Sequence, residues 1–483
     1  MATAYEDIQQ YCRSVAGVTT GTYNENMIQA AKAVTGLSRD MTANEAELLL
    51  LQAISGNYTD TLPGMRTYWQ GPLIPAWVLP GASADIDFAG NRAWVGNTLI
   101  APSAAISTTR ASTGYAQTSS GLLVPFASNT PRITDNGLLV EEARTNLVLQ
   151  SQTFGTSWTA SNTTVTSDAA VAPDGTTTAD QVSDGVATGV FHSVDSANLT
   201  TVNATVYTAS IYAKANSGQF LQIAGFNGSF GANAWGNFDL VAGVVGTMGS
   251  AVTASSITPL GNGWYRCSIT VPATASTGSG GVFFPIITAA NSTRAPTFNG
   301  ANRTFFVWGA QLEAGSFATS YIPTTTTSAT RAADVITLTG AAATAMQGAN
   351  GTLIVQTNNL VNGTGTFSPY LVAGNDQNNS AFTRVNTATT SYSKLANTVL
   401  NSTLGSGAYN TGRVKTGVAW SAAGRSLVAN NGTVATDANA PTAPTTTYIG
   451  SVNGSSPANG LFERVTIWNS RLADATFKAN TAP

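Results

Sequence analysis

Residues 147–323 carry apolar residues in short runs that have the length of β-strands. Gly, Asn, Ser and Thr separate the runs, as expected for turns between antiparallel strands. The spacing of the runs fits two sheets packed face to face. The pattern therefore predicts a jelly-roll β-sandwich, with strands at 204–213, 220–226, 241–248, 264–271, 282–287 and 304–312.

A second β-domain is predicted for residues 331–483. The last strand of the sandwich is followed by Ile322 and Pro323, and proline cannot donate a hydrogen bond to a sheet. Residues 324–330 are polar and uncharged, which is typical of an extended linker. Beyond it, Asn431 and Gly432 tolerate positive φ and suit a hairpin turn, and residues 460–469 (GLFERVTIWN) form an expected closing strand.

Residues 1–70 have a different pattern from the rest of the chain. Apolar residues recur at helical spacing, and residues 42–45 (TANE) form a capping box at the start of a helix. This region also holds 11 of the 45 charged residues. We expect three short helices with a core that is too small to be stable alone. The domain would therefore dock on a partner surface, although a free-standing bundle is the alternative.

Residues 71–146 contain apolar runs that are too short to bury a core of their own. They are interpreted as a β-rich connector that pairs with the next domain or across subunits. A symmetric homo-oligomer, a trimer or a pentamer, is expected on this basis. The fold class is thus mainly all-β, with jelly-roll sandwiches in tandem after a small N-terminal helical domain.

Charge is scarce, at 9% of residues, and the formal net charge is −3. This balance argues against nucleic-acid binding, which needs a basic patch. No run of about 18 apolar residues predicts a membrane span. Glu6 and Asp7 lie where a signal peptide would carry positive charge, so synthesis in a cytoplasm is expected.

Few residues are suited to catalysis or metal binding. Two cysteines, Cys12 and Cys267, and one histidine, His192, cannot supply the usual four ligands of zinc. A serine or cysteine nucleophile needs a base, and His192 lies in a strand-like run. We expect no enzyme activity, no cofactor and no metal.

Carboxylates could still catalyse glycoside hydrolysis, which needs two of them across a cleft. Glu141 and Glu142 are adjacent, whereas Glu313 and Glu463 stand alone. Ion pairs of these acids with Arg144, Arg331 or Arg464 are the preferred interpretation.

Aromatic residues in polar surroundings are the remaining binding candidates. Trp235 in a loop-like stretch, and Tyr370 near Asn375 and Asp376, could stack on sugars and bond to them. Core packing or a solvated turn is the alternative for each of these residues. The scarcity of charge favours a neutral glycan. By contrast, three tryptophans with apolar neighbours inside strands are expected in the core: Trp264, Trp308 and Trp468.

Two segments carry a resemblance to a known family. Residues 137–147 (GLLVEEARTNL) and 308–335 (WGAQLEAGSFATSYIPTTTTSATRAADV) resemble the module of bacteriophage fibre and head-spike proteins, which also occurs on gene transfer agents. The sandwich is similar to carbohydrate-binding modules of such fibres. Residues 412–478 resemble the end of concanavalin- or laminin-G-like domains. Calcium is common in that family, but Asp376 and Asp437 are isolated carboxylates.

The resemblance implies a protein on the virion surface that adheres to a host-surface polysaccharide. Its partners would be capsid, portal or vertex proteins, held through the N-terminal domain, and the host glycan. A head spike is the first interpretation. A tail fibre or other receptor-binding protein, a polysaccharide depolymerase, and a capsid decoration without a ligand are the alternatives.

Deletion of residues 1–70 tests the anchoring role of the helical domain. The truncated protein should stay soluble, because the β-domains have their own cores, but it should no longer join particles. Immunoblotting of purified particles checks this expectation. Particles that still carry the truncated protein would show that the anchor lies elsewhere.

Overall fold

The computed structural model describes residues 28–32, 46, 74–358, 372–373, 383–387, 390–395, 398–403, 412–438, 446–451 and 457–482. Residues 28–32 and residue 46 are helical. The rest of the predicted helical domain lies outside the described residues. So do Cys12, Tyr370, Asn375 and Asp376. In the described parts of the chain strands dominate, and the predicted all-β class is confirmed.

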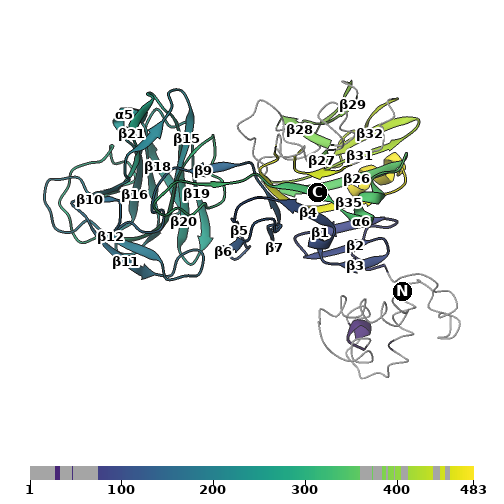
Figure 1. The fold of residues 1–483 in the computed structure, drawn as a ribbon, viewed down its shortest axis with the longest axis horizontal. Coiled ribbons are helices and arrows are strands. Elements are labelled where there is room, and N and C mark those ends of the chain that lie inside the picture. The colour runs from purple at the N-terminus through teal and green to yellow at the C-terminus, as the bar shows by residue number, and fades with distance from the viewer. Residues whose placement is uncertain are drawn as a thin grey trace.

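Residues 147–323 form the predicted sandwich of two six-stranded antiparallel sheets (Figure 1). The first sheet has the order β10 (Thr159–Ser161), β13 (Ser193–Asp195), β22 (Val282–Ile287), β16 (Phe220–Gly225), β17 (Trp235–Asp239), β18 (Val244–Met248). The second has the order β11 (Thr164–Ala170), β12 (Ala179–Ser183), β23 (Thr304–Ala314), β15 (Val206–Ala215), β20 (Trp264–Pro272), β19 (Ala254–Gly261). A small pair, β14 (Leu199–Thr201) and β21 (Thr277–Gly280), and a short helix, α5 (Asn227–Phe230), lie at one end.

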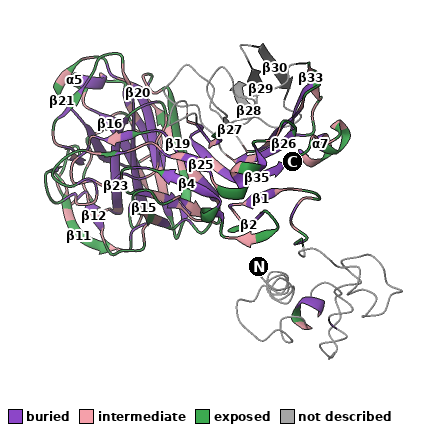
Figure 2. Cartoon of the chain, turned by 45° about the vertical axis from the view of Figure 1, so that its right-hand side comes forward, coloured by how far each residue is buried: buried purple, intermediate pink, exposed green. Residues whose placement is uncertain are grey.

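Alternation along the strands explains this packing. On β20, Cys267, Ile269 and Val271 belong to the core between the sheets, whereas Ser268 and Thr270 lie on the opposite face. The second sheet therefore has an apolar inner face, and its outer face is polar at Ser268 and Thr270 but carries an apolar cluster around Tyr212, Trp264 and Trp308. Figure 2 shows buried residues along the strands of both sheets. Burial raises the pKa of the Cys267 thiol, so this cysteine behaves as a small core residue.

The other lobe is a sandwich of a large and a small sheet. The large sheet has the order β3 (Thr98–Ile100), β2 (Arg92–Val95), β1 (Ala84–Asp87), β35 (Gly460–Trp468), β26 (Gly351–Asn358), β31 (Arg413–Ser421), β32 (Gly424–Ala429), β33 (Ala435–Asp437). β8 (Gly137–Val140) pairs with both β35 and β7 (Ile133–Thr134). The small sheet has the order β27 (Val372–Ala373), β34 (Tyr448–Ile449), β25 (Val335–Leu338), β4 (Ile106–Thr109).

Remaining elements complete the described chain. They are the strands β28 (Thr383–Thr387), β29 (Thr390–Leu395) and β30 (Thr398–Thr403), which form one sheet, and the helices η1 (Pro102–Ala104), α6 (Gly340–Ala345) and α7 (Asp474–Asn480). The predicted closing strand at 460–469 is confirmed as β35.

Residues 71–146 are not the separate connector that the sequence suggested. β1 pairs with β35, with Ile86 opposite Val465, and β8 pairs with the start of the same strand. The core of this lobe combines Ile86, Phe88, Leu138 and Val140 with residues beyond 335. The short runs thus find partners more than 300 residues away. Their incomplete core no longer argues for an oligomer, and the oligomeric state stays a prediction.

The chain passes between the lobes twice, and the two passages pair with each other. β9 (Arg144–Asn146) and β24 (Ala329–Arg331) form an antiparallel ladder. Residues 324–330 are therefore not a free linker; the amide of Gln150 also donates to the carbonyl of Thr325 at 2.8 Å. Residues 147–328 are inserted into the other domain. We call them the insert lobe, and residues 74–143 with 332–482 the host lobe.

A hairpin of the host lobe packs on the insert lobe. β5 (Gly114–Gln117) and β6 (Leu123–Phe126) place Leu123 in an apolar cluster with Leu260 and Trp264. The amide of Leu123 donates to the carbonyl of Pro173 at 2.9 Å. At the tip of the hairpin, Gly121 has φ +90°, and a Cβ there would lie 1.2 Å from the carbonyl oxygen of Leu260. A glycine is required at this contact.

Gly121→Ala should therefore destabilise the protein through both strain and overlap. We expect a loss of about 3 kcal/mol in the free energy of unfolding. Gly185→Ala is the matched control, because Gly185 also has positive φ (+54°) but has nothing within 4 Å of its added Cβ. It should lose about 1 kcal/mol. Urea unfolding measures the stability of both variants. If they lose the same free energy of unfolding, the tip of the hairpin does not contact Leu260.

Candidate functional site

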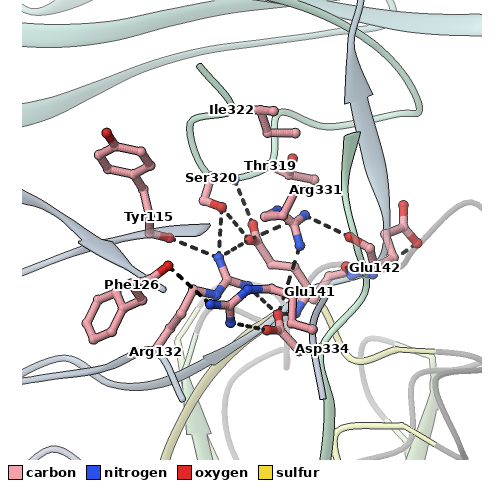
Figure 3. Close-up of polar contacts among 12 residues, drawn as sticks. Tyr115, Phe126, Arg132, Glu141, Glu142, Thr319, Ser320, Ile322, Arg331 and Asp334 are labelled. Carbon is pink, nitrogen blue, oxygen red and sulfur yellow. Dashed lines mark hydrogen bonds and ion pairs between the residues drawn. The ribbon is translucent and has the colours of Figure 1, made fainter. Parts of the chain in front are cut away.

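A cluster of buried charged side chains lies where the chain crosses between the lobes (Figure 3). Arg110 contacts Asp334 at 2.9 Å, and Arg132 contacts Glu141 at 2.7 Å as well as Asp334. Arg331 lies 3.5 Å from Glu141. All five side chains are at most 8% exposed. They come from both segments that carry the family resemblance and from residues 110–132, so the cluster ties three parts of the chain together.

Several further N–H donors of the three arginines bind backbone carbonyls, whereas the Nε atoms of Arg132 and Arg331 are buried without a hydrogen-bond partner. Arg110 donates to the carbonyl of Ala127 at 2.7 Å, Arg132 to that of Tyr115 at 2.9 Å, and Arg331 to that of Glu142 at 2.7 Å. Buried charges cost several kcal/mol each unless they are paired and hydrogen-bonded. These contacts offset that cost and fix the two passages of chain relative to the hairpin.

The ionisation of Glu141 is set by this environment. Burial alone would raise its pKa, but Arg331, Arg132 and the hydrogen bonds from Ser320 outweigh burial and lower the pKa from 4.5 to about 2. Burial also opposes the charge of Arg132, yet Asp334 and Glu141 raise its pKa. The carboxylate of Glu141 is therefore ionised at neutral pH and fully engaged.

Glu141 and Glu313 position a loop of the insert lobe, residues 316–320. Glu141 accepts hydrogen bonds from the amide and hydroxyl of Ser320 at 2.7 and 2.6 Å. Glu313 accepts from the amide and hydroxyl of Thr319 at 2.9 and 2.7 Å. Arg266 donates to the carbonyl of Thr319 at 2.6 Å. The loop thus has a defined place between the lobes.

A cleft of about 580 Å³ opens beside this loop. One wall is the polar outer face of β19 and β20, and the others come from the hairpin, the 316–320 loop and the host lobe. Its main lining residues are Gln117, Asn136, Leu139, Ala254, Ser256, Thr258, Arg266, Ser268, Thr270, Phe317, Asn358 and Leu461. Ala254, Ser256 and Thr258 are exposed, so a ligand can reach this wall. Such a volume lies within the usual range of ~300–1,000 Å³ for small-ligand sites.

Hydroxyl and amide groups make up most of the polar part of the cleft lining, beside apolar side chains such as Leu139 and Phe317. Ser256 and Ser268 share a hydrogen bond of 2.7 Å across β19 and β20. Hydroxyls and amides both donate and accept, as do the hydroxyls of a sugar. Among the described lining residues Glu141 is the single carboxylate. Among the described residues, no three or more His, Cys, Asp or Glu side chains are grouped so that they could hold a metal ion.

The predicted binding residues are not brought together at this cleft. Trp235 lies in β17, opposite Ala224, and is half-buried rather than in a loop. The strand continues through Asn237, whose side chain donates to the carbonyl of Ser292 at 2.7 Å. A role of Trp235 in binding stays a prediction. Tyr370, Asn375 and Asp376 lie outside the described residues.

Trp264, Trp308 and Trp468 are buried, as predicted. His192 is also buried, with its ring nitrogens beside the carbonyl oxygens of Asn162 and Phe298. It has the contacts of a structural histidine.

The acids pair in part as expected, since Glu141 lies 3.5 Å from Arg331. Glu142 pairs with Arg144, as predicted, with 2.6 Å between Oε1 and Nε. Glu463 pairs with Arg413 at 2.8 Å rather than with Arg464, which binds Asp85. Glu313 has hydrogen bonds in place of an ion pair among the described residues. These partners depend on strand registers that the sequence does not specify.

Comparisons with known proteins add likenesses of low similarity. A sialidase CBM40 of Ruminococcus gnavus, solved with α2,3-sialyllactose, is 17% identical, with 30% of this chain and 88% of that chain covered and a TM-score of 0.24. Domains LG4–5 of the mouse laminin α1 chain are 11% identical, with 61% and 91% covered and a TM-score of 0.19. A Trypanosoma rangeli sialidase bound to the inhibitor DANA is 10% identical, with 63% and 60% covered and a TM-score of 0.20. The fold described here rests on strand registers and not on these likenesses.

No protein-family model and no curated protein matches the chain. Among the described residues, no helix is long and apolar enough to cross a membrane.

Glu141→Gln should destabilise the protein by roughly 3–5 kcal/mol, because Arg132 and Arg331 would lose a buried counter-charge. The folded-state pKa of Glu141 is depressed, so its stabilisation is present above pH 4.5 and is lost as pH falls toward 2. The difference in stability between wild type and Glu141→Gln should therefore shrink between pH 4.5 and 2. Urea unfolding at several pH values measures it.

Asp474→Asn is the control for this effect. Asp474 pairs with Arg471 at the surface, where the Asp474 side chain is 44% exposed. A surface pair of this kind contributes up to about 1 kcal/mol. A loss as small as this in Glu141→Gln would contradict a stabilising role for the buried cluster.

Proposed function

We propose that this protein is a glycan-binding fibre or head spike of a virion, which holds the particle to a host-surface polysaccharide. The observation that carries the binding part is the cleft between the lobes. It combines hydroxyl and amide side chains with the apolar surfaces of Phe317 and Leu461. Sugars present the same mixture of hydroxyl groups and apolar C–H faces, so the lining is chemically complementary to them.

The virion part of the proposal rests on the family resemblance of residues 137–147 and 308–335. These two segments meet in the buried charge cluster through Glu141, Arg331 and Asp334. Residues that form one structural junction are expected to recur together in a module, which supports treating both matches as a single signal. On this proposal the protein is made in the host cytoplasm and displayed on the particle through residues 1–70.

The proposed activity is binding without hydrolysis. A glycosidase needs two carboxylates across the scissile bond. Of the described residues that line the cleft, one is a carboxylate, and Glu141 is occupied by Arg132 and Ser320. Affinity for one subunit would be weak, because each net hydrogen bond contributes only about 1 kcal/mol. Many copies on one particle would strengthen adhesion.

Ala254→Trp tests the cleft directly. Ala254 lines the cleft and is exposed, so a tryptophan there should fill the space without entering the core. We expect binding to host polysaccharide, measured by glycan array and by particle adsorption, to fall at least about tenfold. Ala242→Trp is the matched control, because Ala242 is exposed on a turn of the same lobe and does not line the cleft.

The outcomes separate the alternatives. Normal adsorption by Ala254→Trp particles would exclude the cleft, and loss of adsorption in Trp235→Ala alone would place the site on the first sheet. Release of reducing ends from the polysaccharide by the purified protein would contradict binding without hydrolysis. Absence of the protein from purified particles would contradict the virion assignment.

A further inference from the structure

Arg266 differs from Glu141, the other charged residue that lines the cleft, in having no oppositely charged partner among the described residues. Its guanidinium carries five N–H donors. Two have partners among the described residues, the carbonyl of Thr319 at 2.6 Å and the hydroxyl of Ser210 at 3.0 Å. The Nε of Arg266 is buried without a hydrogen-bond partner. No ion pair joins Arg266 to any carboxylate in the described part of the chain, although the buried arginines nearby are all paired.

The position of Arg266 is fixed in advance of any ligand. The guanidinium lies over the ring of Tyr212, 5.1 Å from its centroid. Its two terminal nitrogens are held by hydrogen bonds, one to the carbonyl of Thr319 and one to the hydroxyl of Ser210. A fixed guanidinium loses little conformational freedom when it binds an anion. Glu141, which also lines the cleft, is neutralised by Arg132 and Arg331. Among the described residues that line the cleft, Arg266 is thus the charged side chain without an oppositely charged partner; Glu313, which also binds Thr319, does not line the cleft.

Arg294 shows that these features alone do not make a binding site. It too has a buried Nε without a partner, donates to a backbone carbonyl, that of Gly225, at 2.8 Å, and lies 5.0 Å from an aromatic ring, that of Phe283. Arg294 does not line the cleft, however, whereas Arg266 does. The location of Arg266 beside exposed hydroxyl groups is what separates the two.

We infer that the cleft takes an acidic saccharide, and that Arg266 binds the carboxylate of one of its sugar residues. This inference rests on the proposed glycan-binding function and specifies its ligand class. After the bonds to Thr319 and Ser210, one N–H remains on each of the two terminal nitrogens of Arg266, and these two donors can match the two oxygens of a carboxylate. Ser256, Thr258 and Ser268 lie on the same wall and suit the hydroxyls of the sugar that carries the carboxylate. The low overall charge of the chain, which favoured a neutral glycan, does not bear on this local site.

Carboxyl reduction of the ligand provides a direct test. Each acidic capsular polysaccharide of a panel is compared with the same sample after its uronic acid carboxyls are reduced to primary alcohols, with neutral polysaccharides alongside. The full-length protein should bind at least one acidic sample and should bind its reduced form at least about tenfold more weakly, because a hydrogen bond to a charged group is lost. Binding should also weaken as salt is raised.

Two variants tie this selectivity to the residue. Arg266→Met should lose at least about tenfold in affinity for the acidic sample and little for its reduced form, and Arg266→Lys should fall between wild type and Arg266→Met. Arg294→Met is the matched control, since it removes an arginine with the same contacts outside the cleft, and it should bind normally. Thermal melting of each variant identifies losses that come from unfolding.

Each outcome bears on a different claim. Equal binding of acidic and reduced samples, or undiminished selectivity in folded Arg266→Met, would overturn the inference and leave glycan binding standing. Binding of neutral polysaccharides alone would do the same. No binding to any sample would contradict the proposed function itself. If Arg266→Met unfolds, the wild-type comparison of acidic with reduced samples still decides the inference.

Discussion

Five charged side chains with almost no exposure to solvent occupy the place where the chain passes between its two lobes. Arg110, Arg132 and Arg331 need Glu141 and Asp334 because an unpaired charge at such a site would cost several kcal/mol. Their geometry can be satisfied only when three distant segments of chain are correctly aligned. The cluster therefore contributes specificity of arrangement as well as stability, and the rest of the architecture depends on it.

The nested arrangement follows from this junction. The paired strands β9 and β24 carry the chain out and back, so the insert lobe is attached at two points and cannot swing as a domain on one linker would. The hairpin β5–β6 reaches from the host lobe onto the outer face of the second sheet. Between the hairpin, the loop at 316–320 and that sheet face lies a cleft whose lining combines hydroxyl and amide groups with apolar side chains. Glu141 links the two features, because it belongs to the charge cluster and holds Ser320 beside the cleft.

Local features of the fold could be predicted from the sequence, and long-range pairings could not. Six strands of the insert lobe, the positive φ of Asn431 and the burial of Trp308 follow from alternation and turn residues nearby in the chain. The pairing of Ile86 with Val465 leaves no local signal, so residues 71–146 were misread as a connector. Trp235 was assigned to a loop because its polar neighbours do not form the apolar alternation of a strand, although it lies in β17. The sequence did not identify Arg266 as a binding residue. Whether a carboxylate lies next to its side chain depends on segments far away in the sequence, which the pattern of one strand does not show.

Hydrogen–deuterium exchange of the full-length protein, with and without a polysaccharide that it binds, tests most directly whether the cleft between the lobes is the binding site. The account predicts that protection gained on binding is concentrated in peptides that cover residues 254–260, 316–320 and 459–461, which line the cleft from both lobes. Protection confined to peptides around Trp235, or to the host lobe away from these residues, would contradict it.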